Sequence, residues 1–393
     1  MKTPALSQRT NILKPSPTLA ISARANSMKA DGIDIISFGA GEPDFNTPQP
    51  ICDAAKEAID SGFTKYTPTS GIPELKEAIC GKLSRENGLE YYPSQIVVSC
   101  GAKQSVFNSI QALVNPGEEV ILIAPYWMTY AEQIRLAEGI PVVVTTTAES
   151  GFVPELAKIA EAITSKTKAI LINSPSNPSG AVLPDEILRG IAELAEKHDL
   201  WIISDEIYER LVYGTTFRSI ASFDHNTKDR TITIGGCSKS YAMTGWRIGF
   251  AASPLPVAKA MSNFQDQVTS NPTSFAQRGA VVAFNLPSEN VEVMRAEFEI
   301  RRDLIVGLLS DIPGVKIKSP KGAFYAFPDI SECLLPNETD ADLAEYLLDK
   351  AHVAVVPGSV FEGKGHIRLS YATSRTNIEE GVRRIREALS TRQ

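Results

Sequence analysis

Short apolar runs alternate with amphipathic stretches through the middle of the chain. Near-continuous apolar runs of this length are typical of strands that are buried on both faces of a parallel sheet. The runs are Ile96–Cys100, Val120–Ala124, Val142–Thr146, Ala169–Asn173, Leu200–Ser204, Thr231–Ile234 and Ile248–Ala252. Helical spacing lies between them, at Lys103–Val114, Tyr130–Ala137, Pro154–Ile163 and Asp185–His198. The alternation predicts an α/β fold whose large domain has a mostly parallel seven-stranded sheet between helices.

The N-terminal segment carries helix signals instead. Ser16 and Pro17 have the character of an N-cap and a first helical residue, and the helix that they begin should reach Met28. A short strand is predicted at Ile33–Phe38. Two further helices are predicted at Pro50–Asp60 and Pro73–Asn87.

The pattern changes again from about residue 290. A long charged helix comes first, and short strands and one more helix follow it. The segments are Val291–Leu309, Val315–Lys318, Phe324–Phe327, Ala341–Lys350 and Val353–Val356. This order indicates a smaller α+β domain over residues 290–393, which leaves residues 46–289 for the large domain.

Composition limits the kinds of partner. The chain has 393 residues, a net charge of −7 and no run of basic residues, so two domains are expected and a nucleic-acid partner is not. The five cysteines are scattered without CxxC spacing, which predicts no disulfide framework, no metal site and a cytoplasmic location. No uninterrupted apolar run is long enough to span a membrane, so no membrane partner is expected.

Polar residues follow several of the predicted strands. The carboxyl ends of the strands in an open α/β sheet share one edge, and ligands bind beyond that edge. We therefore expect distant positions to converge there. They are Gly101 to Lys103, Trp127, Asn177, Asp205 and Lys239.

Lys239 and Arg247 lie between two apolar runs, and the segment that holds them is rich in small residues. Burial disfavours an ammonium ion and lowers its pKa, which suits an amine that attacks an aldehyde. Arg247 offers a planar charged fork that suits a phosphate. On this segment alone, a surface lysine and a surface arginine in a glycine loop are an equally good interpretation.

The pattern Ser-Lys-x-Tyr-x-Met-x-Gly-x-Arg at residues 238–247 resembles the pyridoxal-phosphate attachment site of the class I (fold type I) aminotransferases. The resemblance is closest to the subgroup Ib aspartate aminotransferases, which include aspartate/prephenate aminotransferases. It implies a homodimer with active sites at the interface, and it implies that residues 1–45 join the small domain. It covers nearly the whole chain, through Gly41–Phe45, Lys65–Tyr66, Gly71–Leu75, Pro125–Trp127, Asn173–Gly180, Ser204–Glu209 and Arg368–Tyr371.

The resemblance also implies a role for each residue near the cofactor. Lys239 would form the Schiff base and later act as the general base. Asp205 would keep the pyridine nitrogen protonated, although a helix N-cap is its ordinary interpretation. Tyr208 and Asn177 would hydrogen-bond the phenolic oxygen. Trp127 would stack on the ring, or would simply pack in the core.

The phosphate would lie at the start of the helix that follows the strand Ile96–Cys100. Its ligands would be Gly101, Ala102, Lys103, Arg247 and the partner subunit's Tyr66. Related enzymes often have a phosphate-binding serine three residues before the lysine, where this chain has Gly236. Ser238 or backbone groups would have to replace that serine.

The substrate contacts follow from the same resemblance. Arg368 would bind the α-carboxylate bidentately, and Gly41 would let the backbone approach it. Trp127 and Asn177 would also contact the substrate. The second carboxylate would be bound by Lys103 and Thr18, although Thr18 could also be an ordinary residue of a first helical turn.

The sequence thus predicts an enzyme that uses amino-acid and 2-oxo-acid substrates. The expected reaction is ping-pong transamination between L-aspartate and 2-oxoglutarate, which gives oxaloacetate and L-glutamate. Prephenate is an alternative amino acceptor, giving arogenate, and an aromatic-type or alanine-type aminotransferase or a C–S lyase is a further alternative. Two alternatives lie outside the aminotransferases and lyases, namely a non-catalytic regulator and a nicotinamide dehydrogenase.

Overall fold

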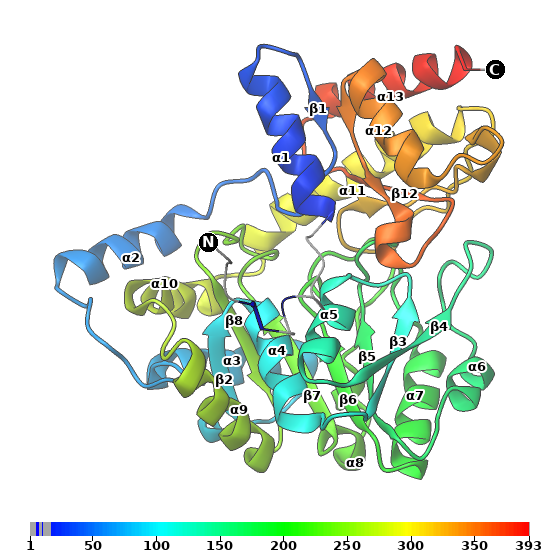
Figure 1. The fold of residues 1–393 in the computed structure, drawn as a ribbon. Coiled ribbons are helices and arrows are strands. Elements are labelled where there is room, and N and C mark those ends of the chain that lie inside the picture. Colours follow the sequence, from blue (N-terminus) through cyan, green and yellow to red (C-terminus); the bar gives the residue numbers. More distant parts are fainter. Residues whose placement is uncertain (1–4, 8–9, 11–16, 393) are drawn as a thin grey trace.

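The computed structural model describes residues 5–7, 10 and 17–392. Figure 1 shows two parts, a lower layered part around a large sheet and an upper part that contains the C-terminal helices. The first strand of the chain lies in the upper part, beside segments that follow residue 350. The chain therefore passes from the upper part to the lower part and back.

The predicted seven-stranded sheet is confirmed, with the order β2-β8-β7-β6-β5-β3-β4. The neighbouring pairs from β4 to β7 are parallel, and β8 is antiparallel to both β7 and β2. Six of the seven strands therefore point in one direction. The strands are β2 (Ile96–Cys100), β3 (Glu119–Ala124), β4 (Ile140–Thr145), β5 (Thr167–Asn173), β6 (Trp201–Asp205), β7 (Thr231–Gly236) and β8 (Ile248–Ala252).

Helices cover both faces of this sheet because its inner strands are apolar on both sides. Val106 and Ile134 pack with Val120 on one face, whereas Ile191 packs with Ile121 on the other. The covering helices are α4 (Ala102–Leu113), α5 (Thr129–Leu136), α6 (Leu156–Glu161), α7 (Asp185–Lys197), α8 (His225–Lys228) and α9 (Leu255–Val268).

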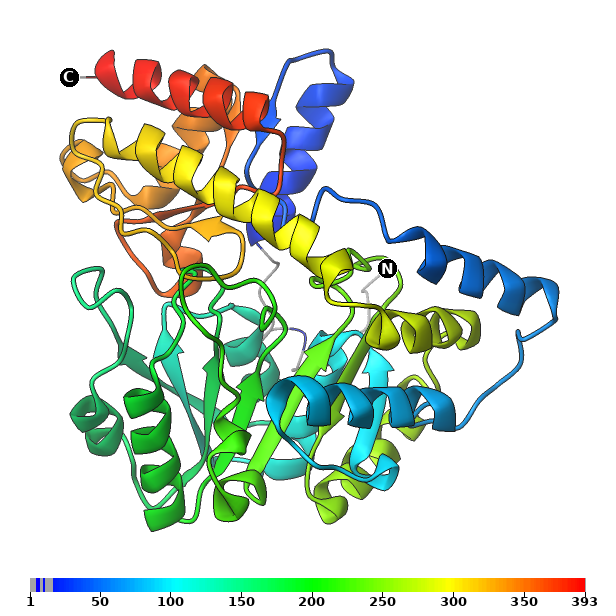
Figure 2. The same ribbon diagram turned by 180° about the vertical axis from the view of Figure 1, so that it is seen from behind.

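Three more helices pack beside the β2 edge. Helix α3 continues as a π-helical turn at Leu83–Asn87, which together match one predicted helix. Figure 2 shows α10 next to α2, with the yellow α11 running from α10 up into the other part. Helices α9 and α10 were not predicted from the sequence. The three helices are α2 (Gln49–Asp60), α3 (Pro73–Lys82) and α10 (Ser274–Asn285).

The smaller part combines both ends of the chain. Strand β1 (Ile36–Ser37) pairs in parallel with β10 (Val353–Ala354). A second sheet is antiparallel, with the order β11-β12-β9, and its strands are β9 (Tyr325–Ala326), β11 (Val356–Pro357) and β12 (Ile367–Ser370). The helices are α1 (Pro17–Ala30), α11 (Glu289–Ser310), α12 (Asp340–Ala351) and α13 (Arg375–Ser390). The domain boundaries 1–45, 46–289 and 290–393 stay a prediction.

Two local predictions differ from the structure. Residues 315–318 form no regular strand, and Lys316 makes only an isolated bridge with Asp329. Helix α13 was not predicted, although Ile378, Val382 and Ile385 give it a buried face. Short 3₁₀ turns at Pro93–Gln95, Ile220–Ser222, Ser331–Cys333 and Gly358–Phe361 complete the elements. Within the part of the chain that the structure describes, no helix is both long and apolar enough to cross a membrane.

Candidate active site

A cleft of about 670 Å³ lies where the carboxyl ends of the parallel strands face the smaller part. Asn173 ends β5 and Asp205 ends β6, as expected for ligand sites in open α/β sheets. The smaller part contributes Gly41, Tyr325 and Arg368 to the opposite wall. Both parts of the molecule are therefore needed to enclose the site.

Lys239 follows β7 and directs its amine across the cleft. Its Nζ donates a hydrogen bond to the carbonyl oxygen of Gly41, and it lies 5.8 Å from the ring centroids of Tyr208 and Phe324. Burial lowers the pKa of Lys239 to about 8, against the opposing effect of the Glu42 carboxylate. A sizeable fraction of this amine is therefore neutral, and hence nucleophilic, near neutral pH.

Asp205 is the buried acid of the cleft, with 3% of its surface exposed. Its Oδ2 accepts a hydrogen bond of 2.7 Å from Tyr130 Oη, and its Oδ1 accepts one of 3.2 Å from the Ile207 amide. Burial raises the pKa of Asp205, and these two hydrogen bonds oppose the rise. A carboxylate held in this way is suited to bind a cationic group such as a protonated ring nitrogen.

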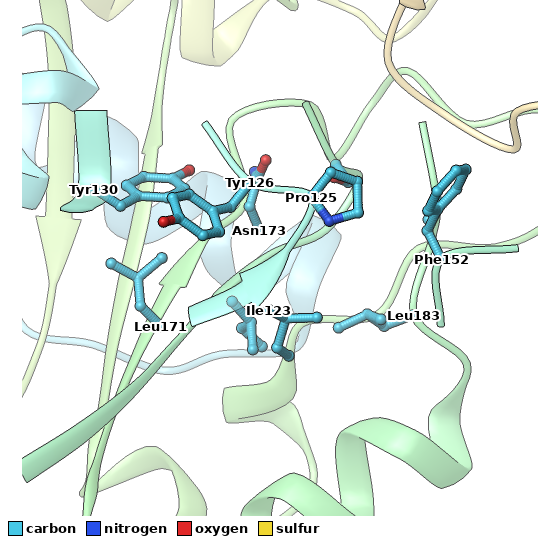
Figure 3. Close-up of a pocket in the computed structure, with 11 residues that line it drawn as sticks. Ile123, Pro125, Tyr126, Tyr130, Phe152, Leu171, Asn173 and Leu183 are labelled. Carbon is cyan, nitrogen blue, oxygen red and sulfur yellow. The ribbon is translucent and has the colours of Figure 1, made fainter. Parts of the chain in front are cut away.

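An apolar floor lies behind Asp205. Figure 3 shows Tyr130 and Tyr126 side by side above Leu171, next to a small internal cavity of about 30 Å³. Tyr130 lines both this cavity and the cleft. The hydrogen bond between Tyr130 and Asp205 is thus formed in surroundings of low polarity, where it is strong.

Tyr208 and Tyr325 form a buried pair of hydroxyl groups, with their Oη atoms 2.8 Å apart. The guanidinium of Arg368 lies 4.5 Å from the ring centroid of Tyr325. Two aromatic side chains from different parts of the molecule thus connect the end of β6 with Arg368.

Arg368 is 3% exposed, and two hydrogen bonds fix the orientation of its guanidinium group. Nη1 donates to Asn177 Oδ1 at 2.9 Å, and Nη2 donates to the Gly39 carbonyl oxygen at 3.0 Å. Its Nε has no partner among the described residues. Because arginine can only donate, it must face the amide oxygen of Asn177, which leaves the Asn177 amino group free to face the cleft.

The start of α4 offers an anion site. Gly101 is the N-cap residue with a φ of 85°, a conformation that favours glycine, and it carries no side chain to cap the helix. The free amide groups and the helix dipole therefore favour an anion at this end. The exposed Arg247 lies beside it and donates to the Thr244 carbonyl oxygen at 2.8 Å.

Gly236 is too crowded to be the serine of the related pattern. A Cβ at this position would lie 2.9 Å from both the Cα of Gly249 and the carbonyl oxygen of Ile248. Ser238 lines the cleft and is buried, so it is the hydroxyl available near Lys239.

Lys103 and Trp127 form one side wall. The Nζ of Lys103 lies 4.9 Å from the Trp127 ring centroid, and the Trp127 ring meets Tyr130 edge to face at 5.4 Å. Desolvation and the nearby charge of Arg247 lower the pKa of Lys103. The wall combines an aromatic face with positive charge.

One predicted site residue, Tyr66, is not brought to the cleft within this chain, and the prediction for Thr18 is not tested. Tyr66 is 92% exposed and does not line it. Thr18 lies in α1, and its side chain is outside the described residues. The other predicted residues line the cleft or, as Gly101 does, border it.

Sequence reasoning missed three residues of the site. Tyr130 stands one helical turn after Trp127, so helical spacing could have indicated it. Glu42 accepts a hydrogen bond of 2.7 Å from Thr244, and Tyr325 reaches Tyr208 across 117 residues of sequence. No local signal marks contacts of that kind.

Comparisons with known proteins identify relatives over the whole length of the chain. The family model "Aminotransferase class I and II" matches residues 33–385. A probable aspartate/prephenate aminotransferase of Aquifex aeolicus is 51% identical, with 98% of each chain covered. An aspartate aminotransferase of Bacillus subtilis is 47% identical, over 97% of this chain and 98% of the relative. The aspartate aminotransferase of Thermus thermophilus with maleate superposes with a TM-score of 0.94 at 43% identity, covering 98% of this chain and 100% of that structure.

Proposed function

The chain belongs to the class I and II aminotransferases, and from this premise we propose that it moves an amino group between L-aspartate and 2-oxoglutarate, giving oxaloacetate and L-glutamate. Its relatives are aspartate aminotransferases and aspartate/prephenate aminotransferases in about equal measure. The observation that supports the proposal best is the meeting of Lys239, Asp205 and Arg368 in one cleft.

Pyridoxal phosphate is the cofactor of this family, and when bound it supplies an aldehyde that takes up the amino group and a ring that withdraws electrons from the substrate. The cleft suits such a group because it has an open helix end for the phosphate and a buried carboxylate for the ring nitrogen. We assign the phosphate to the backbone amides of Gly101, Ala102 and Lys103 and to the side chain of Arg247.

The ring contacts come from four side chains. Asp205 would bind the ring nitrogen and hold a proton there, because a buried carboxylate favours a cationic partner. Tyr208 and the amino group of Asn177 would donate to the ring oxygen. Trp127 would cover the face of the ring, where its edge-to-face contact with Tyr130 fixes its orientation.

Lys239 has two tasks in this proposal. Its neutral amine attaches the cofactor, which fits a pKa of about 8. The same Nζ would also act as the general base that takes the proton from the substrate Cα. The contact with Gly41 keeps the amine on the side of the cleft where Arg368 would bind the substrate.

Arg368 would bind the α-carboxylate of the substrate. Its side chain is already oriented by Asn177 and Gly39, so little conformational entropy is lost on binding. Lys103, together with Thr18, would bind the second carboxylate of aspartate or glutamate. The position of Lys103 above Trp127 leaves its charge directed into the cleft.

Use of prephenate is the second candidate function. It is favoured by the 51% identity to the relative from Aquifex aeolicus that is named a probable aspartate/prephenate aminotransferase. Prephenate also carries two carboxylates, so the same pair of cationic residues would bind it. An aromatic-type or alanine-type enzyme would instead have no need of Lys103.

A spectroscopic and kinetic experiment tests the proposal. The purified protein should be yellow, and L-aspartate should bleach its visible band. Values of kcat/KM should then be measured for aspartate, glutamate, alanine and phenylalanine with 2-oxoglutarate, and for glutamate and aspartate with prephenate. A higher kcat/KM for alanine or phenylalanine than for aspartate would refute the aspartate assignment, and turnover of prephenate would establish the second activity.

We also propose a homodimer in which the partner subunit's Tyr66 completes the phosphate site. The loop that carries Tyr66 is held by buried glutamines, since Gln277 donates to Thr67 Oγ1 at 3.0 Å and Gln265 donates to the Thr69 carbonyl oxygen at 2.7 Å. An exposed aromatic on a rigid loop costs little entropy to bury against a partner. The exposed Val268 lies on α9, where Asp266 accepts from Thr69.

Sedimentation equilibrium tests the dimer. The dimer is expected at micromolar concentration, and Val268→Glu should shift it toward the monomer. Tyr66→Phe should leave the assembly unchanged and weaken cofactor binding, and a fully active monomer would contradict the proposal.

The five cysteines are all free thiols, which supports the expected cytoplasmic location.

A further inference from the structure

We propose that Tyr325 is a positioning residue that donates its hydroxyl proton to Tyr208 and thereby connects Arg368 with the oxygen of the cofactor ring. This inference rests on the proposed function, in which Tyr208 donates to that oxygen. It assigns a task to an uncharged residue of the cleft wall.

The two hydroxyl groups form a rigid pair. Tyr208 and Tyr325 are 3% and 1% exposed, and their Oη atoms are 2.8 Å apart. Their rings meet edge to face at 5.8 Å, and Phe324 packs against the Tyr208 ring at 5.5 Å. Neither hydroxyl can turn away without breaking a buried hydrogen bond.

The direction of the hydrogen bond between the two hydroxyl groups follows from the number of O–H donors. A phenol has one O–H, so Tyr208 cannot donate both to Tyr325 and to the cofactor oxygen. If Tyr208 serves the cofactor, Tyr325 must be the donor of the pair. Gly41 lies beside the Tyr325 hydroxyl, since an added Cβ there would lie 3.3 Å from Oη. Tyr325 therefore sets the orientation of the Tyr208 proton.

Arg368 acts on this pair through the ring of Tyr325. Its guanidinium lies 4.5 Å from the ring centroid, where a cation draws electron density from the phenol. Its charge lowers the pKa of Tyr325 against the larger opposing effect of burial, which makes the hydroxyl a better donor. A substrate carboxylate bound at Arg368 would offset this charge and weaken the donor. Binding of a carboxylate at Arg368 would thus weaken the hydrogen bond that Tyr208 donates to the cofactor oxygen.

The test is the pH titration of the visible band of the holoenzyme, which reports on the charge of the cofactor oxygen. Loss of the Tyr325 hydroxyl weakens donation to that oxygen, so Tyr325→Phe should raise the titration midpoint by about 0.5 to 1 pH unit. Maleate, a dicarboxylate that does not react, should shift the midpoint of the wild type and should shift that of Tyr325→Phe by less. An unchanged midpoint and an unchanged maleate shift would overturn the inference.

A double mutant separates a direct effect from an effect through Tyr208. In a Tyr208→Phe background, Tyr325→Phe should cause no further shift, because the two residues act in series. An equal shift in both backgrounds would overturn the inference. The matched control is Tyr213→Phe, since Tyr213 is a buried tyrosine of the same core that donates to the Ala323 carbonyl oxygen and does not line the cleft. It should lower the melting temperature and leave the midpoint unchanged.

If Tyr325→Phe fails to fold, 3-fluorotyrosine at position 325 keeps the shape of the side chain and makes its hydroxyl a stronger donor. The midpoint should then fall, and a rise would overturn the inference. The wild type distinguishes this outcome from failure of the proposed function. A wild-type protein that binds no pyridoxal phosphate would overturn both, whereas a normal wild-type titration with no effect at Tyr325 would overturn the inference alone.

Discussion

The pKa of Lys239 gives a quantitative prediction for the protein without its cofactor. Burial lowers this pKa to about 8, and Glu42 is the nearby group that most strongly opposes the change. At pH 7.5 about a quarter of the amines are then neutral, whereas about one in a thousand would be neutral at the ordinary pKa of 10.5. The neutral, reactive form of Lys239 should therefore be about 200 times more abundant than that of an ordinary lysine, and the apo-protein should react faster with pyridoxal phosphate than a surface lysine does.

The assay is a stopped-flow measurement of the visible band after apo-protein is mixed with pyridoxal phosphate, between pH 6 and pH 10. The rate constant should rise about tenfold per pH unit in the acidic range and level off above pH 8, since only the neutral amine attacks. A model amine measured in parallel corrects for the titration of pyridoxal phosphate itself. Lys239→Ala should form no such band.

Glu42→Gln tests the electrostatic part of the reasoning. The Glu42 carboxylate favours the ammonium form of Lys239, so its removal should move the midpoint below pH 8. The glutamine can still accept the hydrogen bond from Thr244, which keeps the local geometry. A wild-type rate that keeps rising to pH 10, or a midpoint that rises in Glu42→Gln, would refute the reasoning.

Four further predictions follow from the same structure. Tyr130→Phe removes a hydrogen bond to the Asp205 carboxylate, so the cofactor affinity should fall about 10-fold to 100-fold in a dialysis titration, and an unchanged affinity would contradict this. Arg368→Lys loses the fork and should raise the KM for aspartate about 100-fold while the visible spectrum of the holoenzyme stays normal. Lys103→Ala should raise the KM for aspartate far more than that for alanine, and equal effects would remove its assignment. Burial and Glu209 raise the pKa of Glu206 to about 8, so the folded state binds this proton more tightly than the unfolded state. The free energy of unfolding should therefore fall by about 1.4 kcal/mol per pH unit from about pH 5 to pH 8. Glu206→Gln should flatten this slope in thermal melts.

The large sheet was predictable because its inner strands are buried on both faces. A strand such as Ile248–Ala252 must then be apolar at every position, which is visible without any knowledge of its neighbours. Helices α9 and α10 lack a comparable signal. Their buried faces mix apolar residues with amides, and the buried Gln265 and Gln277 hold the loop at residues 67–72 by hydrogen bonds. Only tertiary contacts show that these polar positions belong inside.

Much of the site was predictable for a related reason. Parallel strands end at one edge, so Asn177, Asp205 and Lys239 were expected to converge once the strands were assigned. Tyr325 is different, because its place depends on the pairing of β9 with β12 and on how the smaller part meets the larger one. Neither the strand pairing nor the packing of the two parts produces a recognisable sequence pattern within a few residues of position 325. Contacts of this kind are set by tertiary packing and not by local pattern.

The charges of the cleft explain how a protein with a net charge of −7 can bind anionic ligands. Four cationic side chains line it, and the neutral form of Lys239 still leaves three. Three acids of the described part of the chain also line it. Glu132 is paired with Arg135 at 2.6 Å, Glu42 accepts a hydrogen bond from Thr244 at 2.7 Å, and Asp205 lies at the floor where a ring nitrogen would neutralise it. The remaining positive charge lies at Arg247 and Lys103 near the start of α4 and at Arg368 on the opposite wall. These charges favour the binding of both a phosphate and a dicarboxylate. Binding should therefore weaken for both ligands as ionic strength rises, and more steeply for a dicarboxylate than for a monocarboxylate substrate.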